Sequence, residues 1–181
     1  MFLTKNSKIP DILKKTARTS DIWKKKLLEN KKKIITDLDL FYLFNPKIKT
    51  IVVTGTNGKS SVVNFFYQIL NFNKVSVASI GTLGIFSKNY NKKTNLTSMD
   101  PLSLHKNLQI LAKNKARNVI LEASSHGLNQ KRLDNLNIKT GIFTNLSHDH
   151  LDYHKNMKSY FDSKMYLFKN LINKIYKINT D

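Results

Sequence analysis

A glycine-rich loop with a lysine and a serine at its end could bind the phosphates of a nucleotide. The loop consists of Thr54, Gly55, Thr56, Asn57, Gly58, Lys59, Ser60 and Ser61. Glycines let successive backbone N–H groups point at one anion, and the N-terminus of the following helix adds a favourable potential. Lys59 is expected to reach the outer phosphates, and the Ser60 hydroxyl is expected to face magnesium. Val53 stands where such loops usually have their first glycine, so a simple glycine turn with a solvated lysine is the alternative.

A second polar segment follows the apolar run at residues 118–121. Its first residue, Glu122, is a carboxylate at the end of a buried strand, where it could hold magnesium directly or through water. A structural salt bridge is the alternative. Ser124, Ser125 and His126 come next and could contact a substrate, but the serines could equally cap a helix by accepting hydrogen bonds from its first N–H groups.

A third polar segment, residues 144–154, follows the apolar run at 140–143 and contains three histidines and two aspartates. This composition suggests zinc. However, zinc sites take several well-oriented nitrogen or sulfur ligands, whereas phosphate loops employ magnesium, which prefers oxygen. We therefore favour magnesium chemistry at this segment over a zinc site.

The elements that must position these segments alternate between strand and helix. Apolar, β-branched runs predict strands, and apolar residues at helical spacing predict helices. The pair Asp100-Pro101 predicts a helix start, because aspartate caps well and proline suits the first turn. Strands are expected at residues 50–53, 75–80, 118–121, 140–143 and 175–178, and helices after 61, after 100 and over 157–171.

This alternation predicts an α/β fold that contains a P-loop and a largely parallel sheet flanked by helices. In such sheets, ligands bind beyond the carboxyl ends of the strands. The three polar segments each follow a predicted strand, so we expect them to meet at one edge of the sheet.

Composition narrows the class of protein further. The 181 residues carry a formal net charge of +19 but no cysteine, which excludes disulfides and thiolate metal sites. No apolar stretch reaches the roughly 18 residues of a membrane span, and the start lacks a secretory signal. Lysine supplies nearly all the positive charge, whereas base-specific readers rely on arginine. We therefore expect a cytoplasmic protein that binds no membrane and no specific nucleic acid.

Together, the three segments resemble the Mur ligase family, MurE type, the UDP-N-acetylmuramoyl-tripeptide synthetases. The matching stretches are residues 54–61, 122–128 with Gln130 and Arg132, and 143–154 with Lys164. The resemblance implies that residues 47–181 are the central ATP-binding domain, incomplete at its C-terminal end. It also implies that residues 1–46 are a partial N-terminal segment or linker and that the C-terminal ligase domain is absent. Within residues 1–46, the residue pattern by itself predicts a helix at 22–28.

The resemblance also implies roles for matching positions. Lys59, His150 and Lys164 would be the catalytic residues, and Ser60, Glu122 and His150 would hold magnesium. Lys164 would be carbamylated, which turns a cation into an anion that helps to hold a second magnesium. That modification needs a neutral amine, which burial or nearby positive charge favours. The alternative is a solvated helix lysine. The residues implied in substrate binding are Thr97, Ser98, Ser124, Ser125, His126 and Arg132.

The implied reaction is ATP-driven amide synthesis through an acyl phosphate. The implied substrates are UDP-N-acetylmuramoyl-L-alanyl-D-glutamate and a third amino acid, meso-diaminopimelate or L-lysine, and the enzyme would be a monomer. This chain alone is expected to be inactive. Two alternatives remain: a folylpolyglutamate synthetase-like ligase, which shares the loop, and a basic nucleic-acid-binding protein with a decayed P-loop fold.

Overall fold

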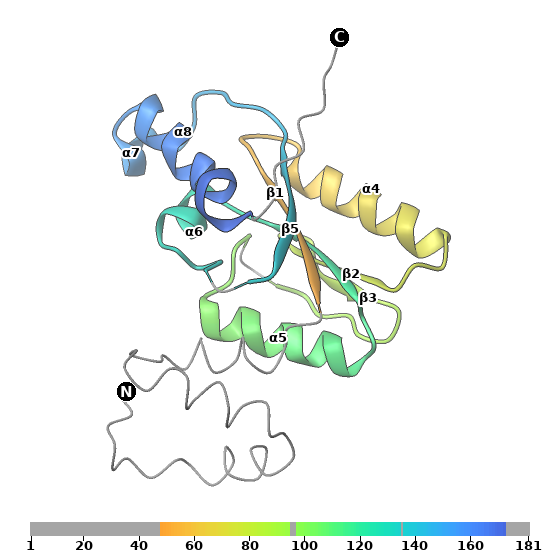
Figure 1. Ribbon diagram of the computed structural model, residues 1–181. Helices are drawn as coiled ribbons and strands as arrows, with labels where there is room; N and C mark the ends of the chain where they lie inside the picture. The colour runs from red at the N-terminus through yellow and green to blue at the C-terminus, as the bar shows by residue number, and fades with distance from the viewer. Residues whose placement is uncertain (1–47, 95–96, 135, 173–181) are drawn as a thin grey trace, which may run out of the picture. The chain divides into compact units, whose positions relative to one another are not determined.

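The computed structural model describes residues 48–94, 97–134 and 136–172 (Figure 1). The predictions for residues 1–46 and for a strand at 175–178 lie outside the described residues. In chain order the elements are β1 (Lys49–Thr54), α4 (Lys59–Phe72), β2 (Val77–Gly81), β3 (Gly84–Ser87), α5 (Pro101–Lys113), β4 (Asn118–Glu122), α6 (Ser125–Asn129), β5 (Ile138–Phe143), α7 (Leu151–His154), α8 (Met157–Tyr166) and η1 (Leu167–Leu171).

The described strands form one sheet in the order β3-β2-β4-β1-β5. The four predicted strands in this part of the chain are confirmed, and they pair in parallel. The sequence did not predict β3, which pairs antiparallel with β2 at the sheet edge. Gly81 and Gly84 face each other across a tight hairpin. Gly84 has φ +130, a value that favours glycine.

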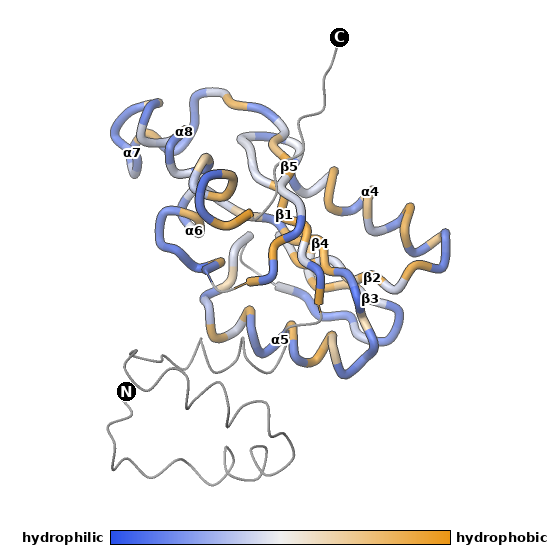
Figure 2. The backbone as a smooth tube through the Cα atoms, in the orientation of Figure 1, coloured by the Kyte–Doolittle hydropathy of each residue, from blue (hydrophilic) through white to orange (hydrophobic). Residues whose placement is uncertain are grey.

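Helices cover both faces of the sheet (Figure 1). Side chains alternate across a strand, so Val53 of β1 and Ile120 of β4 pack with Val63 of α4 on one face. Their neighbours Val52 and Leu121 point to the other face, in a larger core that includes residues of α5, α6 and η1. Figure 2 shows apolar residues along the central strands of this two-sided core.

The predicted start of α5 is confirmed. Asp100 is its N-cap and accepts a 2.9 Å hydrogen bond from the Ser103 amide, and proline occupies the first turn. The helix predicted over 157–171 is an α-helix to Tyr166 that continues as a π-helical turn to Leu171. Within the described ranges, no helix is long and apolar enough to cross a membrane.

Candidate active site

The glycine-rich loop joins β1 to α4 and leaves the start of the helix open. Gly58, the N-cap, has φ +80 and offers no side chain to the first turn. Within the part of the chain that the structure describes, the amides of residues 58–61 donate to no protein acceptor. Four aligned, uncommitted N–H groups at a helix N-terminus form an anion-binding site.

A second loop, which follows β5, holds the glycine-rich loop in this shape. Asn145 accepts hydrogen bonds from the Thr56 amide through its backbone oxygen and from the Asn57 amide through Oδ1, both at 2.9 Å. The Thr144 hydroxyl donates to the Asn57 carbonyl at 2.7 Å. A Cβ on Gly55, which has φ +140, would lie 2.0 Å from Thr144 Oγ1. Only glycine therefore allows the two loops to approach this closely.

Glu122 lies at the carboxyl end of β4 and is 2% exposed. Its Oε2 accepts a 3.0 Å hydrogen bond from the Ser60 hydroxyl, and the Thr82 amide and hydroxyl both donate to the carboxylate at 3.1 Å. Among the described residues, no basic side chain comes within 4 Å of it, so the salt-bridge alternative has no partner here. A Cβ on Gly81 would lie 2.1 Å from Oε1, so this carboxylate occupies space that only glycine leaves.

The Lys59 ammonium folds back onto its own loop. Nζ donates to the carbonyl of Thr56 at 2.6 Å and to that of Gly55 at 3.1 Å. Burial lowers the pKa of Lys59, and the charges of Glu122 and Asp149 partly offset this. The positive charge therefore lies at the loop where phosphates would bind.

Lys164 lies on α8, more than a hundred residues after the glycine-rich loop, and its side chain is buried. It is 1% exposed, and Nζ donates to the Gly55 carbonyl at 2.6 Å and lies 4.3 Å from the centre of the Tyr160 ring. Burial lowers the pKa of Lys164 to about 8, and the positive charge of Lys59 adds to that effect while Asp149 opposes it. The alternative of a solvated helix lysine is wrong.

His150 lies in a group of rings that includes His126 and Tyr160. It adopts a left-handed conformation with φ +52 just before α7. Its ring centre lies 4.9 Å from that of His126, and its Nε2 is 3.4 Å from Asp149. Among the described residues, no hydrogen bond or ion pair joins it to Ser60, Glu122 or Lys164. The structure thus brings together Ser60 and Glu122 but does not place His150 in contact with them.

The predicted substrate residues lie next to one another, and several bind each other. Ser124 is the N-cap of α6 and accepts a 3.0 Å hydrogen bond from the Gly127 amide, so the capping alternative is confirmed for this residue. The Ser98 hydroxyl accepts a 2.9 Å hydrogen bond from the Ser124 amide, and Arg132 donates to the Ser98 carbonyl at 2.9 Å. The Thr97 hydroxyl lies 2.9 Å from the Thr82 hydroxyl, which itself donates to Glu122.

Ser125 and His126 differ in exposure. Ser125 is 1% exposed, and its hydroxyl lies 2.9 Å from the His154 ring, so in this structure that hydroxyl makes a hydrogen bond inside the protein. His126 is partly exposed and packs against the Tyr153 ring, with 4.1 Å between ring centres. Burial lowers the pKa of His126, and the nearby His150 adds to this. His154, which the sequence analysis did not single out, is thus part of the same cluster.

The residues fit a magnesium-bound nucleotide. The open amides of 58–61 and the Lys59 charge suit phosphates, and the Ser60 hydroxyl with the Glu122 carboxylate forms an oxygen pair suited to a hard cation. Zinc would require a larger nitrogen or sulfur set. In the described ranges, no three His, Asp or Glu side chains are arranged to hold a metal ion.

Comparisons with known proteins agree with this site. The profile of the Mur ligase middle domain matches residues 53–181. UDP-N-acetylmuramoyl-L-alanyl-D-glutamate--2,6-diaminopimelate ligases are similar in sequence: that of Chelativorans sp. is 47% identical over 68% of this chain and 26% of its own. That of Rickettsia bellii is 42% identical over 90% of this chain and 37% of its own.

A solved structure of a ligase of the same name superposes with a TM-score of 0.61 at 37% identity, over 67% of this chain and 24% of that one. The chain therefore spans about a quarter to a third of the length of the relatives it matches. The match to the middle-domain profile covers well over half of the 181 residues and includes the phosphate loop, Glu122 and Lys164. This chain belongs to the Mur ligase family.

Proposed function

We propose that this chain supplies the ATP-binding part of a ligase that joins diaminopimelate to UDP-N-acetylmuramoyl-L-alanyl-D-glutamate. The names of its relatives support the choice of substrates. The observation that carries the proposal is the open helix N-terminus of residues 58–61 beside the contact between Ser60 and Glu122. These relatives also favour the cell-wall ligase over a folylpolyglutamate synthetase-like enzyme.

The proposed reaction has two steps. The terminal carboxylate of the acceptor attacks the γ-phosphorus of ATP, and the bond between that phosphorus and the ADP oxygen breaks, which gives an acyl phosphate and ADP. The amine of the amino acid then attacks the acyl carbon. The bond from that carbon to the phosphate oxygen breaks, phosphate leaves, and the nitrogen loses a proton to give the amide.

The protein contributes alignment and charge neutralisation to such a phosphoryl transfer. The amides of 58–61 hold phosphate oxygens. Lys59 leaves the carbonyls of Gly55 and Thr56 and neutralises the negative charge that develops on the transferred group. Ser60 and Glu122 would hold a magnesium ion, which would supply screening of the phosphate charge. We assign His150 to the same magnesium ion; it would have to move toward Ser60 and Glu122, because among the described residues no hydrogen bond or ion pair joins it to them.

Lys164 is proposed to react with carbon dioxide before it acts. A neutral amine and CO₂ form a carbamate and release one proton. The low pKa of Lys164 supplies the neutral amine, and the nearby Lys59 charge favours the anionic product. A carbamate on Lys164 would offer oxygen ligands to a second magnesium ion.

The acceptor is proposed to bind over α6, at the partly exposed side chains of Thr97, His126 and Arg132. Ser98 and Ser125 are buried, so we assign them to holding these groups in place. Because the reaction uses ATP and a UDP-linked precursor, we place the enzyme in the cytoplasm. Its state as a monomer stays a prediction.

Isothermal titration calorimetry on the 181-residue chain tests the proposal. We expect Mg·ADP to bind to the wild-type chain and to bind at least tenfold more weakly to Lys59→Ala. UDP-N-acetylmuramoyl-dipeptide should be retained and a folate should not. We expect this binding without appreciable phosphate release from the 181-residue chain.

The same experiment addresses the nucleic-acid alternative raised by the net charge of +19. Under that alternative, DNA or RNA would bind tightly, would dissociate steeply with salt, and would bind equally well to Lys59→Ala. That result, together with no detectable Mg·ADP binding, would refute the ligase proposal.

A further inference from the structure

The buried histidine of α7 is hydrogen-bonded at both ring nitrogens. His154 is 3% exposed. Its Nε2 lies 2.9 Å from the Ser125 hydroxyl on α6, and its Nδ1 lies 3.3 Å from the Ser163 hydroxyl on α8. A hydroxyl can donate or accept, so the direction of each bond has to be worked out from its surroundings.

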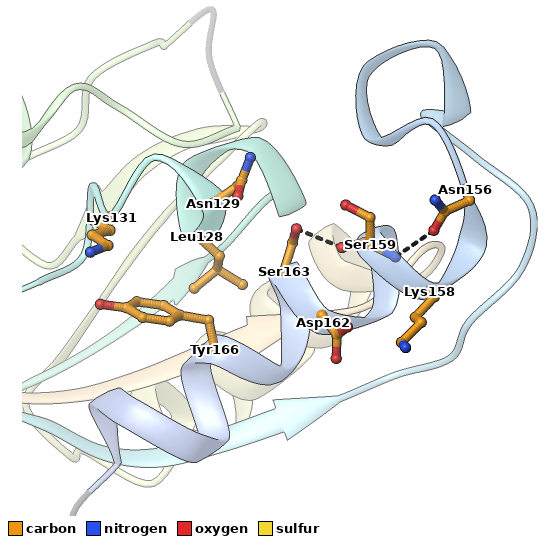
Figure 3. Close-up of a pocket in the computed structure, with 9 residues that line it drawn as sticks. All are labelled: Leu128, Asn129, Lys131, Asn156, Lys158, Ser159, Asp162, Ser163 and Tyr166. Carbon is orange, nitrogen blue, oxygen red and sulfur yellow. Dashed lines mark hydrogen bonds between the residues drawn. The ribbon is translucent and has the colours of Figure 1, made fainter.

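Ser163 fixes both directions. Its hydroxyl donates to the Ser159 carbonyl at 2.8 Å, a bond drawn in Figure 3. A hydroxyl has a single hydrogen, so Ser163 must accept at its contact with His154, and Nδ1 must carry the proton. In a neutral ring, Nε2 then has only a lone pair, and the Ser125 hydroxyl donates to it.

The surroundings of the ring favour its neutral form. Burial lowers the pKa of His154, and the charges of His126, His150 and Lys164 add to this, while Asp152 opposes it. Tyr160 also packs on the ring, with 5.3 Å between ring centres. The hydrogen-bonded chain therefore runs in one direction, from Ser125 through the Nδ1–H tautomer of His154 to Ser163 and on to the carbonyl of Ser159.

This chain of bonds joins the segments that carry the proposed magnesium ligands. Ser125 follows Glu122 by three residues, His154 follows His150 by four, and Ser163 directly precedes Lys164. Glu122 lies on β4, His150 on the loop before α7, and Lys164 on α8, so the three proposed ligands come from separate stretches of the sequence. One imidazole thus spans all three segments.

We propose that His154 is a positioning residue that fixes the segments carrying Glu122, His150 and Lys164 relative to one another through its Nδ1–H tautomer. The inference rests on the proposed magnesium–nucleotide site, because only there does this placement matter. Groups of this kind, which orient ligands without touching the metal, commonly change metal affinity by about 10- to 100-fold when they are removed.

The tautomer can be measured directly. Two-bond ¹H–¹⁵N spectra of the histidine side chains distinguish Nδ1–H from Nε2–H, and the signal of His154 is the one that His154→Asn removes. We expect Nδ1–H at pH 7 in the wild-type chain. Ser163→Ala removes the acceptor for that proton and should shift the ring toward Nε2–H. Ser163 lines a pocket of about 460 Å³ between α6 and α8 (Figure 3), so the variant opens no sealed cavity.

The consequence is tested by ADP affinity with and without magnesium. His154→Leu breaks both bonds, His154→Asn retains a donor toward Ser163, and His154→Gln retains an acceptor toward Ser125. We expect the leucine variant to weaken magnesium-dependent ADP binding by about tenfold, the two amide variants to fall between it and wild type, and metal-free ADP binding to change by less than about twofold. His105→Leu, which removes another buried imidazole on α5, is the matched control and should bind like wild type.

The outcomes distinguish a failure of the positioning role of His154 from a failure of the proposed function. An Nε2–H or doubly protonated His154 in the wild-type chain at pH 7 would overturn the inference, as would wild-type Mg·ADP affinity in His154→Leu. If the leucine variant does not fold, the amide variants and Ser163→Ala decide by the same comparison. If the wild-type chain itself fails to bind Mg·ADP, the proposed function is wrong, and the positioning role is refuted with it even when the tautomer is Nδ1–H.

Discussion

Lys164 should carry a carbamate in the presence of bicarbonate, and its environment sets how readily. The carbamate forms only from the neutral amine. With a pKa of about 8, Lys164 is neutral in about a quarter of molecules at pH 7.5, whereas a lysine with the ordinary pKa of 10.5 is neutral in roughly one in a thousand. The structure therefore predicts that Lys164 is a few hundred-fold better supplied with reactive amine than an exposed lysine.

Carbon-13 NMR with labelled bicarbonate provides the assay. We expect one carbamate resonance in the wild-type chain at pH 8 and none in Lys164→Arg, which keeps the positive charge but cannot form this product. The signal should weaken as the pH falls below 7, because protonation removes the amine. Lys59→Met should also weaken it, since the charge of Lys59 both lowers the pKa of Lys164 and favours an anion beside it.

The matched control is Lys158→Arg, which changes an exposed lysine of the same helix and should leave the resonance intact. Two results would refute the reasoning. One is a carbamate signal that persists at full strength in Lys164→Arg. The other is a wild-type chain with no such signal at pH 8, which would mean that the buried amine is not available to CO₂.

Three further predictions concern stability. The lowered pKa of Lys164 means that the unfolded chain binds more protons than the folded chain between pH 8 and 10.5, so the free energy of unfolding should rise with pH in that range. Urea unfolding in CO₂-free buffer should show an increase of up to about 2 kcal/mol in that free energy from pH 7.5 to 9.5. The Lys164→Met variant should lack this increase. Gly55→Ala should lower the free energy of unfolding by at least about 2 kcal/mol, because its Cβ would overlap Thr144. Gly58→Ala has φ +80 but open space around it, so it should lower that free energy by only about 1–2 kcal/mol. Equal losses in thermal unfolding would contradict the overlap at Gly55. Asp100→Ala removes the cap of α5 and should cost about 1 kcal/mol in urea, and an unchanged midpoint would mean that the cap contributes nothing.

The parallel strands and the phosphate loop could be predicted from the sequence because they depend on local patterns. Residues 50–53 form a short β-branched run before glycines, and Asp100-Pro101 is a local helix-start signal. The sequence did not predict the hairpin strand β3, because glycines such as Gly81 and Gly84 usually interrupt regular structure. Gly84–Ser87 is a strand because it pairs with β2, and its own residues do not indicate that pairing.

The candidate site divides in the same way. Lys59 and Ser60 could be assigned from spacing, but nothing local to Lys164 indicates that it is buried or that it reaches Gly55 across 109 residues. The family resemblance pointed to Lys164, and the structure shows that its side chain is buried against the Gly55 carbonyl. The role of His154 depends on bonds to two other helices, so no local pattern could reveal it.

We propose that the amides at the start of α4 bind the phosphates of a magnesium-bound nucleotide. An amide ¹H–¹⁵N NMR titration of the chain with Mg·ADP tests it residue by residue. We expect the largest shifts on residues 58–61, whose amides have no acceptor among the described residues, and we expect Lys59→Ala to abolish them at the same ligand concentration. If those four amides stay in place while others move, or if Lys59→Ala titrates like the wild type, the nucleotide does not bind where this structure requires it.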